Sequence, residues 1–133
     1  MSEKIKIKFL GTSAQIPTVK RNHSAILLTY GEENILVDCG EGTQRQIRLA
    51  KLNPCKITKI LITHKHGDHT FGLPGLISTL NVSEYKKTLE IYGPKGIKKF
   101  LGDFLDLTTT KIKKFNGSDP ISLYAFNQIV SKA

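Results

Sequence analysis

The sequence has no tryptophan, one methionine and only two cysteines among its 133 residues. Cys39 and Cys55 are too few for a disulfide framework, so we expect reduced thiols that are either small core residues or residues without a specific role. No apolar run approaches the roughly 18 residues that a transmembrane helix needs, and residues 1–4 lack the apolar stretch of a secretion signal. These absences predict a cytoplasmic protein with no membrane partner.

Acidic residues are also scarce. The chain has 11 Asp and Glu against 20 Lys and Arg, which gives a formal net charge of +9. A positive field attracts anionic partners such as nucleic acid, although lysine-rich surfaces also serve solubility. Hydrophobic residues make up 39% of the chain, which is enough for one domain with a packed core and unlike the composition of disordered proteins.

Strand and helix patterns alternate along the first 107 residues. Apolar periodicity predicts strands over 4–10, 24–30, 35–37, 57–63 and 89–92, and helices over 43–52, 74–80 and 95–107. This order predicts an α/β protein with layers of helices and sheet. Residues 121–130 fit either a strand or a helix.

Three of these segments carry more detailed predictions. In the first strand, Ile5, Ile7 and Phe9 share one face and three lysines the other, which predicts a half-buried strand near a sheet edge. The run 57–63 is almost continuously apolar, as expected for a central strand covered on both faces. Thr43 is expected to cap the helix that follows it.

Histidines and an aspartate gather directly after that central strand, in the pattern His64-x-His66-x-Asp68-His69. Imidazoles and carboxylates are ligands that divalent transition metals prefer. In an extended turn, residues 64 and 66 can reach one ion while 68 and 69 reach a second. The pattern therefore predicts a two-metal hydrolytic centre suited to phosphodiester cleavage, with a solvated histidine-rich loop as the structural alternative. Gly67 is expected to permit a sharp turn between the two pairs.

Two further polar residues lie outside that pattern. Asp38 ends an apolar strand, where it could supply a functional carboxylate or simply cap a turn. His23 is isolated from the other histidines in sequence, and we expect it to be a loop or core residue rather than a catalytic one.

Three longer segments accompany the histidine pattern. They are Phe9-Leu10-Gly11-Thr12-Ser13-Ala14, Asp38-Cys39-Gly40-Glu41-Gly42-Thr43-Gln44 and Gly67-Asp68-His69-Thr70-Phe71-Gly72-Leu73-Pro74-Gly75-Leu76. With the histidines, they resemble the metallo-β-lactamase superfamily and, within it, the ribonuclease Z family of tRNA 3′-end processing endonucleases. The resemblance implies the αββα sandwich of the superfamily. Residues 1–115 would form its N-terminal half, and 116–133 a divergent or truncated tail.

Carried over residue by residue, the resemblance implies that His64 and His66 bind one zinc ion and that Asp68 and His69 bind the other. Mn²⁺ and Fe²⁺ are compatible with the same ligands. Asp68 would also act as the catalytic proton acceptor. Asp38 would support the zinc ligands by orienting their imidazoles.

The resemblance also implies a precursor tRNA substrate, whose 3′ trailer is removed by a di-metal-activated hydroxide, and a homodimeric enzyme. Lys20, Arg21 and Asn22 match the substrate-binding loop of the family, although Val19 stands where that loop usually carries lysine. The net positive charge agrees with an RNA partner.

The later metal ligands of the family have no match in this sequence. None of the four histidines follows His69, and Asp119 does not match the bridging aspartate. We therefore expect the first half of a larger domain, with little activity alone because each ion lacks ligands. Such a half would expose one face of its sheet and favour self-association. The alternatives are a superfamily hydrolase of small esters or phosphodiesters and a non-catalytic fragment.

Overall fold

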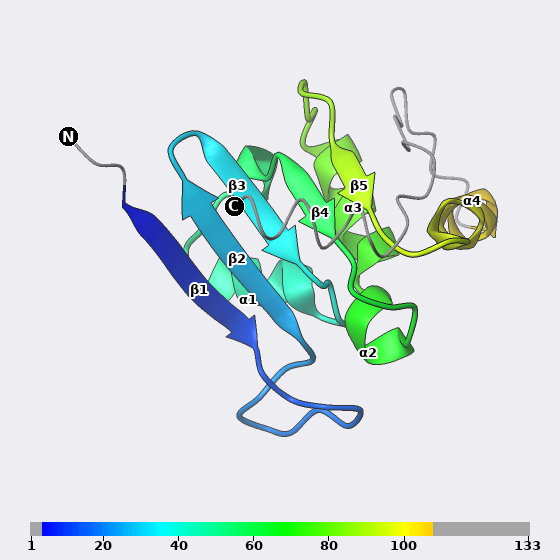
Figure 1. The fold of residues 1–133 in the computed structure, drawn as a ribbon, viewed down its shortest axis with the longest axis horizontal. Coiled ribbons are helices and arrows are strands. Elements are labelled where there is room, and N and C mark those ends of the chain that lie inside the picture. Colours follow the sequence, from blue (N-terminus) through cyan, green and yellow to red (C-terminus); the bar gives the residue numbers. More distant parts are fainter. Residues whose placement is uncertain (1–3, 108–133) are drawn as a thin grey trace.

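In the computed structural model, which describes residues 4–107, five strands form one sheet in the order in which they occur along the chain (Figure 1). The antiparallel part contains β1 (Ile5–Gly11), β2 (Ala25–Tyr30) and β3 (Glu33–Val37). β4 (Lys59–Leu61) and β5 (Glu90–Tyr92) continue from β3 in parallel. Parallel neighbours need crossover connections, and these connections contain the helices.

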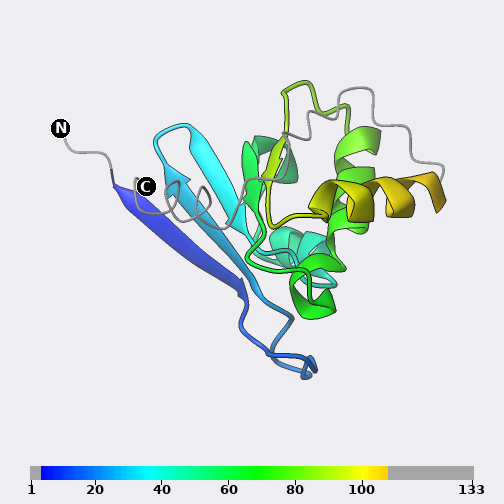
Figure 2. The ribbon, with the colours of Figure 1, turned by 45° about the vertical axis from the view of Figure 1, so that its right-hand side comes forward.

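The helices occupy one face of the sheet (Figure 2). The β3–β4 connection contains α1 (Thr43–Leu49) and the short 3₁₀ helix η1 (Pro54–Lys56), and the β4–β5 connection contains α2 (Gly67–Thr70) and α3 (Leu73–Val82). α4 (Ile97–Leu107) follows β5. Together, these elements confirm the predicted layered α/β architecture.

The core lies between the helices and one row of strand residues. Leu27, Leu36, Ile60 and Ile91 are neighbours across four strands and are all buried. They belong to one cluster with the apolar sides of α1, α3 and α4, whose buried members are Ile47, Leu73, Leu76, Ile77, Leu80, Ile97 and Leu101. Burial of this continuous apolar surface is the main favourable term that holds the layers together.

The opposite face of the sheet is open at β1. Ile5, Ile7 and Phe9 point to this face and are 53%, 57% and 65% exposed. The prediction of a half-buried β1 is therefore wrong, because no described helix covers the side on which its apolar residues lie. Its place at the sheet edge and the exposure of an apolar sheet face are both confirmed.

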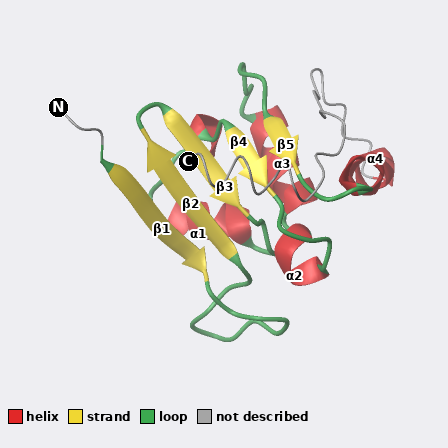
Figure 3. Ribbon diagram, in the orientation of Figure 1, coloured by secondary structure: helices red, strands yellow, loops and turns green. Residues whose placement is uncertain are grey.

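Most predicted elements are present, with shifted ends (Figure 3). The strand predicted over 57–63 is shorter, although its residues Ile60 and Leu61 are buried as expected. Thr43 does not cap α1, because Gly42 is the N-cap and the Thr43 hydroxyl donates to the Gly40 carbonyl oxygen instead. The helix α2 was not predicted. Residues 121–130 and the boundary expected near 115 lie outside the described part of the chain.

None of the helices within residues 4–107 is both long and apolar enough to cross a membrane. Cys39 is fully buried, as expected, whereas Cys55 is partly exposed and packs against the margin of the core. Burial raises the pKa of the Cys39 thiol to about 12, so this side chain is a neutral core residue.

Candidate metal centre

Asp38 is the residue that connects the sheet to the candidate site. It follows the last residue of β3, and its amide donates to the Leu61 carbonyl oxygen over 2.8 Å, which extends the pairing of β3 with β4. Its φ of 62° is in the left-handed region, which aspartate adopts more readily than most residues. The residue is only 4% exposed, so its carboxylate needs hydrogen-bond donors from the protein.

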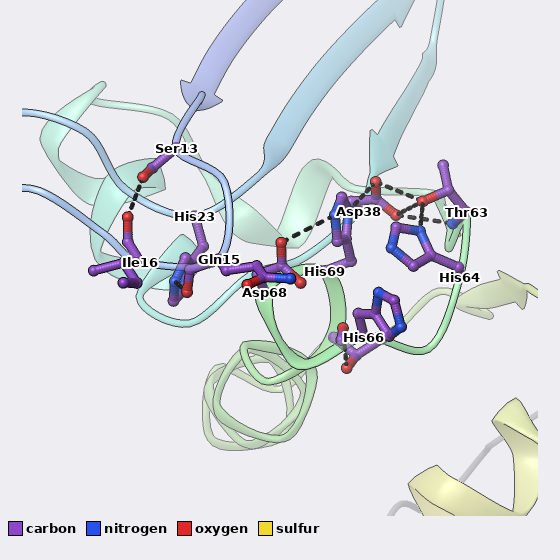
Figure 4. A network of polar contacts seen from close by, with 11 residues as sticks. Ser13, Gln15, Ile16, His23, Asp38, Thr63, His64, His66, Asp68 and His69 are labelled. Carbon is purple, nitrogen blue, oxygen red and sulfur yellow. Dashed lines mark hydrogen bonds and ion pairs between the residues drawn. The ribbon is translucent and has the colours of Figure 1, made fainter.

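Those donors come from the segment after β4. The backbone amide of Thr63 donates to Oδ1 of Asp38 over 2.8 Å, and the Thr63 hydroxyl lies 3.0 and 2.9 Å from the two carboxylate oxygens. Nδ1 of His69 lies 2.7 Å from Oδ2 (Figure 4). Asp38 therefore joins the end of β3 to the histidine-rich loop and fixes the orientation of His69.

The same contacts determine which nitrogen of each ring is available. The Asp38 carboxylate can only accept, so Nδ1 of His69 carries the hydrogen and Nε2 is left with its lone pair. The Thr63 hydroxyl donates to Asp38 and can accept from Nδ1 of His64, which is 2.9 Å away. If Nδ1 of His64 carries the hydrogen in this contact, Nε2 of His64 keeps its lone pair, as Nε2 of His69 does. Both rings thus offer the neutral nitrogen that a metal requires.

Potential ligand atoms of His64, Asp68 and His69 all lie within 4.8 Å of one another. Oδ2 of Asp68 is 3.3 Å from Nε2 of His69. With the hydrogen of His69 on Nδ1, these two atoms are both acceptors, and they can approach so closely without repulsion only if a cation or a proton lies between them. Two imidazoles and a carboxylate in this arrangement suit a divalent transition metal.

His66 lies at the edge of this cluster. Its ring is 4.7 Å from that of His64, centre to centre, but it is not among the three residues whose ligand atoms converge. Its carbonyl oxygen accepts from the His69 amide and the Thr70 hydroxyl, each over 3.0 Å, at the start of α2. The structure thus groups residues 64, 68 and 69, whereas the sequence predicted separate pairs 64/66 and 68/69.

Glycines allow the loops of the site to approach closely. Gly67 does not adopt a positive φ, so the predicted sharp turn does not depend on glycine, and a Cβ there would lie 2.4 Å from the exposed Phe71 ring, which would have to shift. A Cβ on Gly40 would lie 2.3 Å from Cβ of His23 and 2.5 Å from the Asp68 carbonyl oxygen. Gly40 thereby lets the segments around His23 and Asp68 pack against the turn that follows Asp38.

The predicted substrate-binding residues lie on the loop between β1 and β2. Lys20 and Arg21 line an open groove of about 700 Å³ within this loop. Nδ2 of Asn22 donates to the Glu41 carbonyl oxygen over 2.6 Å, which ties the loop to the turn after Asp38. The loop and the histidine cluster therefore lie at the same end of the sheet (Figure 3).

Sequence reasoning missed Thr63, which connects Asp38 to His64. A hydroxyl residue directly before the first histidine was the available signal. Its role depends on contact with a residue 25 positions away, and local spacing does not reveal such a contact.

The arrangement of strands and helices is that of a metallo-β-lactamase fold protein, with the histidine–aspartate cluster at the end of the sheet. The Bacillus subtilis metallo-β-lactamase fold protein YhfI has a similar structure, with a TM-score of 0.68 and 24% identity over 86% of this chain and 46% of its own. Residues 5–120 match the family model described as anti-Pycsar protein Apyc1, and the chain therefore belongs to that family.

The predicted resemblance to ribonuclease Z is also confirmed. Ribonuclease Z of Methanothermobacter thermautotrophicus is 50% identical over 93 residues, which are 70% of this chain and 30% of that protein. The short form of human tRNase Z matches with a TM-score of 0.79 and 43% identity, over 85% of this chain and 44% of its own. The chain spans 30 to 40% of the length of the curated relatives that it matches.

Proposed function

We propose that the chain provides part of the metal centre of a ribonuclease Z-type endoribonuclease, which removes the 3′ trailer from precursor tRNA. The observation that carries the proposal is the convergence of His64, Asp68 and His69 within 4.8 Å, with His69 oriented by the buried Asp38. The similarity to ribonuclease Z supports the substrate class. We further propose zinc as the metal, two ions in the complete site, and a cytoplasmic homodimer.

The proposed chemistry assigns each residue a task. His64, Asp68 and His69 would hold one metal ion, and His66 would contribute to the second; a bound metal would supply a Lewis acid that makes water easier to deprotonate. A carboxylate oxygen of Asp68 accepts the proton of the attacking water. Asp38 keeps hydrogen on Nδ1 of His69 so that Nε2 remains available.

The loop between β1 and β2 supplies the contact to RNA in this proposal. Lys20 and Arg21 are exposed cations beside the groove, where they can neutralise phosphates of the substrate. Asn22 holds the loop against Glu41, close to the metal centre. A site with two zinc ions needs more ligands than residues 4–107 bring together, because each catalytic zinc usually has three protein ligands and a water, and only three ligand residues converge here.

The match to the anti-Pycsar protein Apyc1 model favours a second candidate within the same superfamily. In this alternative, the metal centre hydrolyses a small phosphodiester or ester rather than tRNA. The two candidates share the histidine–aspartate cluster and differ in whether the β1–β2 loop binds an RNA chain.

A two-substrate assay with added zinc tests the proposal. Precursor tRNA and bis(p-nitrophenyl) phosphate are each incubated with the chain and with its His64→Ala variant, and zinc binding is measured by competition with a chromophoric chelator. We expect zinc binding that His64→Ala weakens, binding of precursor tRNA, and little or no tRNA cleavage by the chain alone. Hydrolysis of the small ester without binding of tRNA would favour the second candidate, and absence of zinc binding would refute both.

A further inference from the structure

His23 is a buried histidine that the proposed chemistry does not use. It is 7% exposed and lies at the end of the β1–β2 loop, close to Asp68 in Figure 4. Its Nε2 lies 3.0 Å from the Gln15 carbonyl oxygen. A carbonyl oxygen only accepts, so Nε2 carries the hydrogen and donates it across the loop.

The other ring nitrogen has no such contact. Within the part of the chain that the structure describes, Nδ1 of His23 is buried without a hydrogen-bond partner. Burial of an unpaired polar atom is unfavourable, and an apolar side chain of similar size would avoid it. The hydrogen bond to Gln15 is therefore the contribution of His23 that an apolar residue could not make.

That hydrogen bond crosses the loop that carries Lys20 and Arg21. The loop is closed at its base by a bridge between Ser13 and His23 and by the Ser13 amide, which donates to the Asn22 carbonyl oxygen over 2.8 Å. Farther out, the Thr18 amide donates to the Arg21 carbonyl oxygen over 2.9 Å. The His23 ring thus connects the buried base of the loop to its exposed middle.

His23 also lies against the metal centre. Its Cβ occupies the space beside Gly40, where an added Cβ would be 2.3 Å from it and 2.5 Å from the Asp68 carbonyl oxygen. The base of the loop is therefore packed against the segment that carries Asp68. The position of the two loop cations relative to the metal ligands depends on this packing and on the His23–Gln15 hydrogen bond.

We infer that His23 is a positioning residue that holds the loop 12–22 in a preformed shape, with Lys20 and Arg21 placed to bind the phosphates of an RNA 3′ end beside the metal centre. The inference rests on the proposed function. A preformed loop binds more tightly than a flexible one because less conformational freedom is lost on binding.

Three variants separate this role from a merely structural one. His23→Leu removes the donor and fills the space, and His23→Gln retains an N–H group near the position of Nε2. Val82→Thr changes an exposed side chain of α3, outside the loop and the metal centre, and serves as the control. Amide hydrogen exchange of peptides covering 12–22 reports on the loop, and peptides covering 33–38 report on the stability of the sheet.

We expect His23→Leu to accelerate exchange in 12–22 and to weaken the binding of precursor tRNA, each by about 2- to 10-fold, as for the loss of one hydrogen bond. Exchange in 33–38 and zinc affinity should remain as in the wild type. His23→Gln should restore both loop exchange and tRNA affinity to within about twofold, and Val82→Thr should match the wild type.

Two results would overturn the inference. The first is unchanged exchange of 12–22 in His23→Leu, and the second is faster exchange there with undiminished tRNA affinity. Because the exchange measurement needs no RNA, it distinguishes the inference from the proposed function. Failure of the wild-type chain to bind precursor tRNA would count against the proposed function, and would also remove the RNA-positioning role of His23 even if the loop measurement succeeded.

Discussion

Oδ2 of Asp38 lies 2.7 Å from Nδ1 of His69, although the two residues are 31 positions apart in the chain. This contact joins the end of β3 to the helix α2 and leaves Nε2 of His69 directed toward Asp68. The chemistry of the cluster therefore depends on a carboxylate that is not itself among the three converging ligands.

Asp38→Asn tests this dependence. Asparagine keeps the size of the side chain and tolerates the left-handed backbone, but its amide cannot accept all the hydrogen bonds from Thr63 and His69. We expect zinc affinity to fall by about 10- to 100-fold, measured by chelator competition. Glu32→Gln, at an exposed carboxylate outside the site, should leave the affinity unchanged. Equal zinc affinities for Asp38→Asn and the wild type would show that the contact between Asp38 and His69 does not affect zinc binding.

Alanine variants of the histidines test how the ligands are grouped. His64 belongs to the three-residue cluster, whereas His66 lies beside it. We expect His66→Ala to retain one bound zinc per chain and His64→Ala to lose it, because only the latter removes a converging ligand. Zinc content after dialysis, measured by mass spectrometry, gives the stoichiometry. Loss of all zinc in His66→Ala would favour the 64/66 pairing that the sequence predicted.

Two glycine-to-alanine changes should have opposite effects on stability. A Cβ at Gly72 would lie 2.0 Å from the Gly40 carbonyl oxygen, so Gly72→Ala should destabilise the fold by about 1–3 kcal/mol through overpacking. Gly102 lies within α4, and apart from its chain neighbours and the backbone of that helix no heavy atom lies within 4 Å of an added Cβ. There, alanine should stabilise by about 0.5–1 kcal/mol because it restricts the unfolded chain. Urea unfolding measures the free energy of unfolding of both variants. Similar decreases in that free energy in the two variants would contradict the prediction.

The buried thiol of Cys39 predicts a loss of stability in alkali. Burial raises its pKa from 9.0 to about 12, so the folded chain retains a proton that the unfolded chain releases earlier. The stabilisation is present below pH 9 and declines as the pH rises toward 12, by at most about 1.4 kcal/mol per pH unit. Burial also raises the pKa of Tyr92 from 10.0 to about 12, so the interval from pH 9 to 10 is the most specific for Cys39.

Urea unfolding at several pH values within that interval checks this prediction. The free energy of unfolding should decline with pH in the wild type and less steeply in Cys39→Ala, which lacks the titrating thiol. Cys55→Ala provides the control that retains Cys39. Parallel declines in the wild type and Cys39→Ala would exclude the thiol as the cause.

The open sheet face predicts self-association. Ile7 and Phe9 are 57% and 65% exposed on the same side of β1. The double variant Ile7→Thr/Phe9→Thr keeps residues suited to a strand while it removes apolar surface. We expect less association by sedimentation velocity and less binding of a hydrophobic dye. Lys8→Thr, on the other face of the strand, should not reduce either signal. Association that persists in the double variant would assign it to another surface.

Much of the fold could be predicted because it is encoded in local patterns. The alternation in β1, the apolar run around Ile60 and the helical spacing in α4 each predicted an element of the right type. The side chains capable of metal binding were also evident, since His64, His66, Asp68 and His69 lie within one short segment of the chain. Element ends were less accurate because they depend on contacts such as the hydrogen bond from Thr43 to Gly40.

The sequence by itself determined the order of strands and helices, the ligand types and the family, because each depends on which residues are neighbours along the chain. Only the tertiary structure decided that Thr63 and Asp38 orient the imidazoles, that His64 groups with Asp68 and His69, and that Ile5, Ile7 and Phe9 remain exposed. The physical reason is that hydrogen bonding and burial depend on the distances and side-chain directions between segments that are far apart in sequence. Only folding brings these segments together.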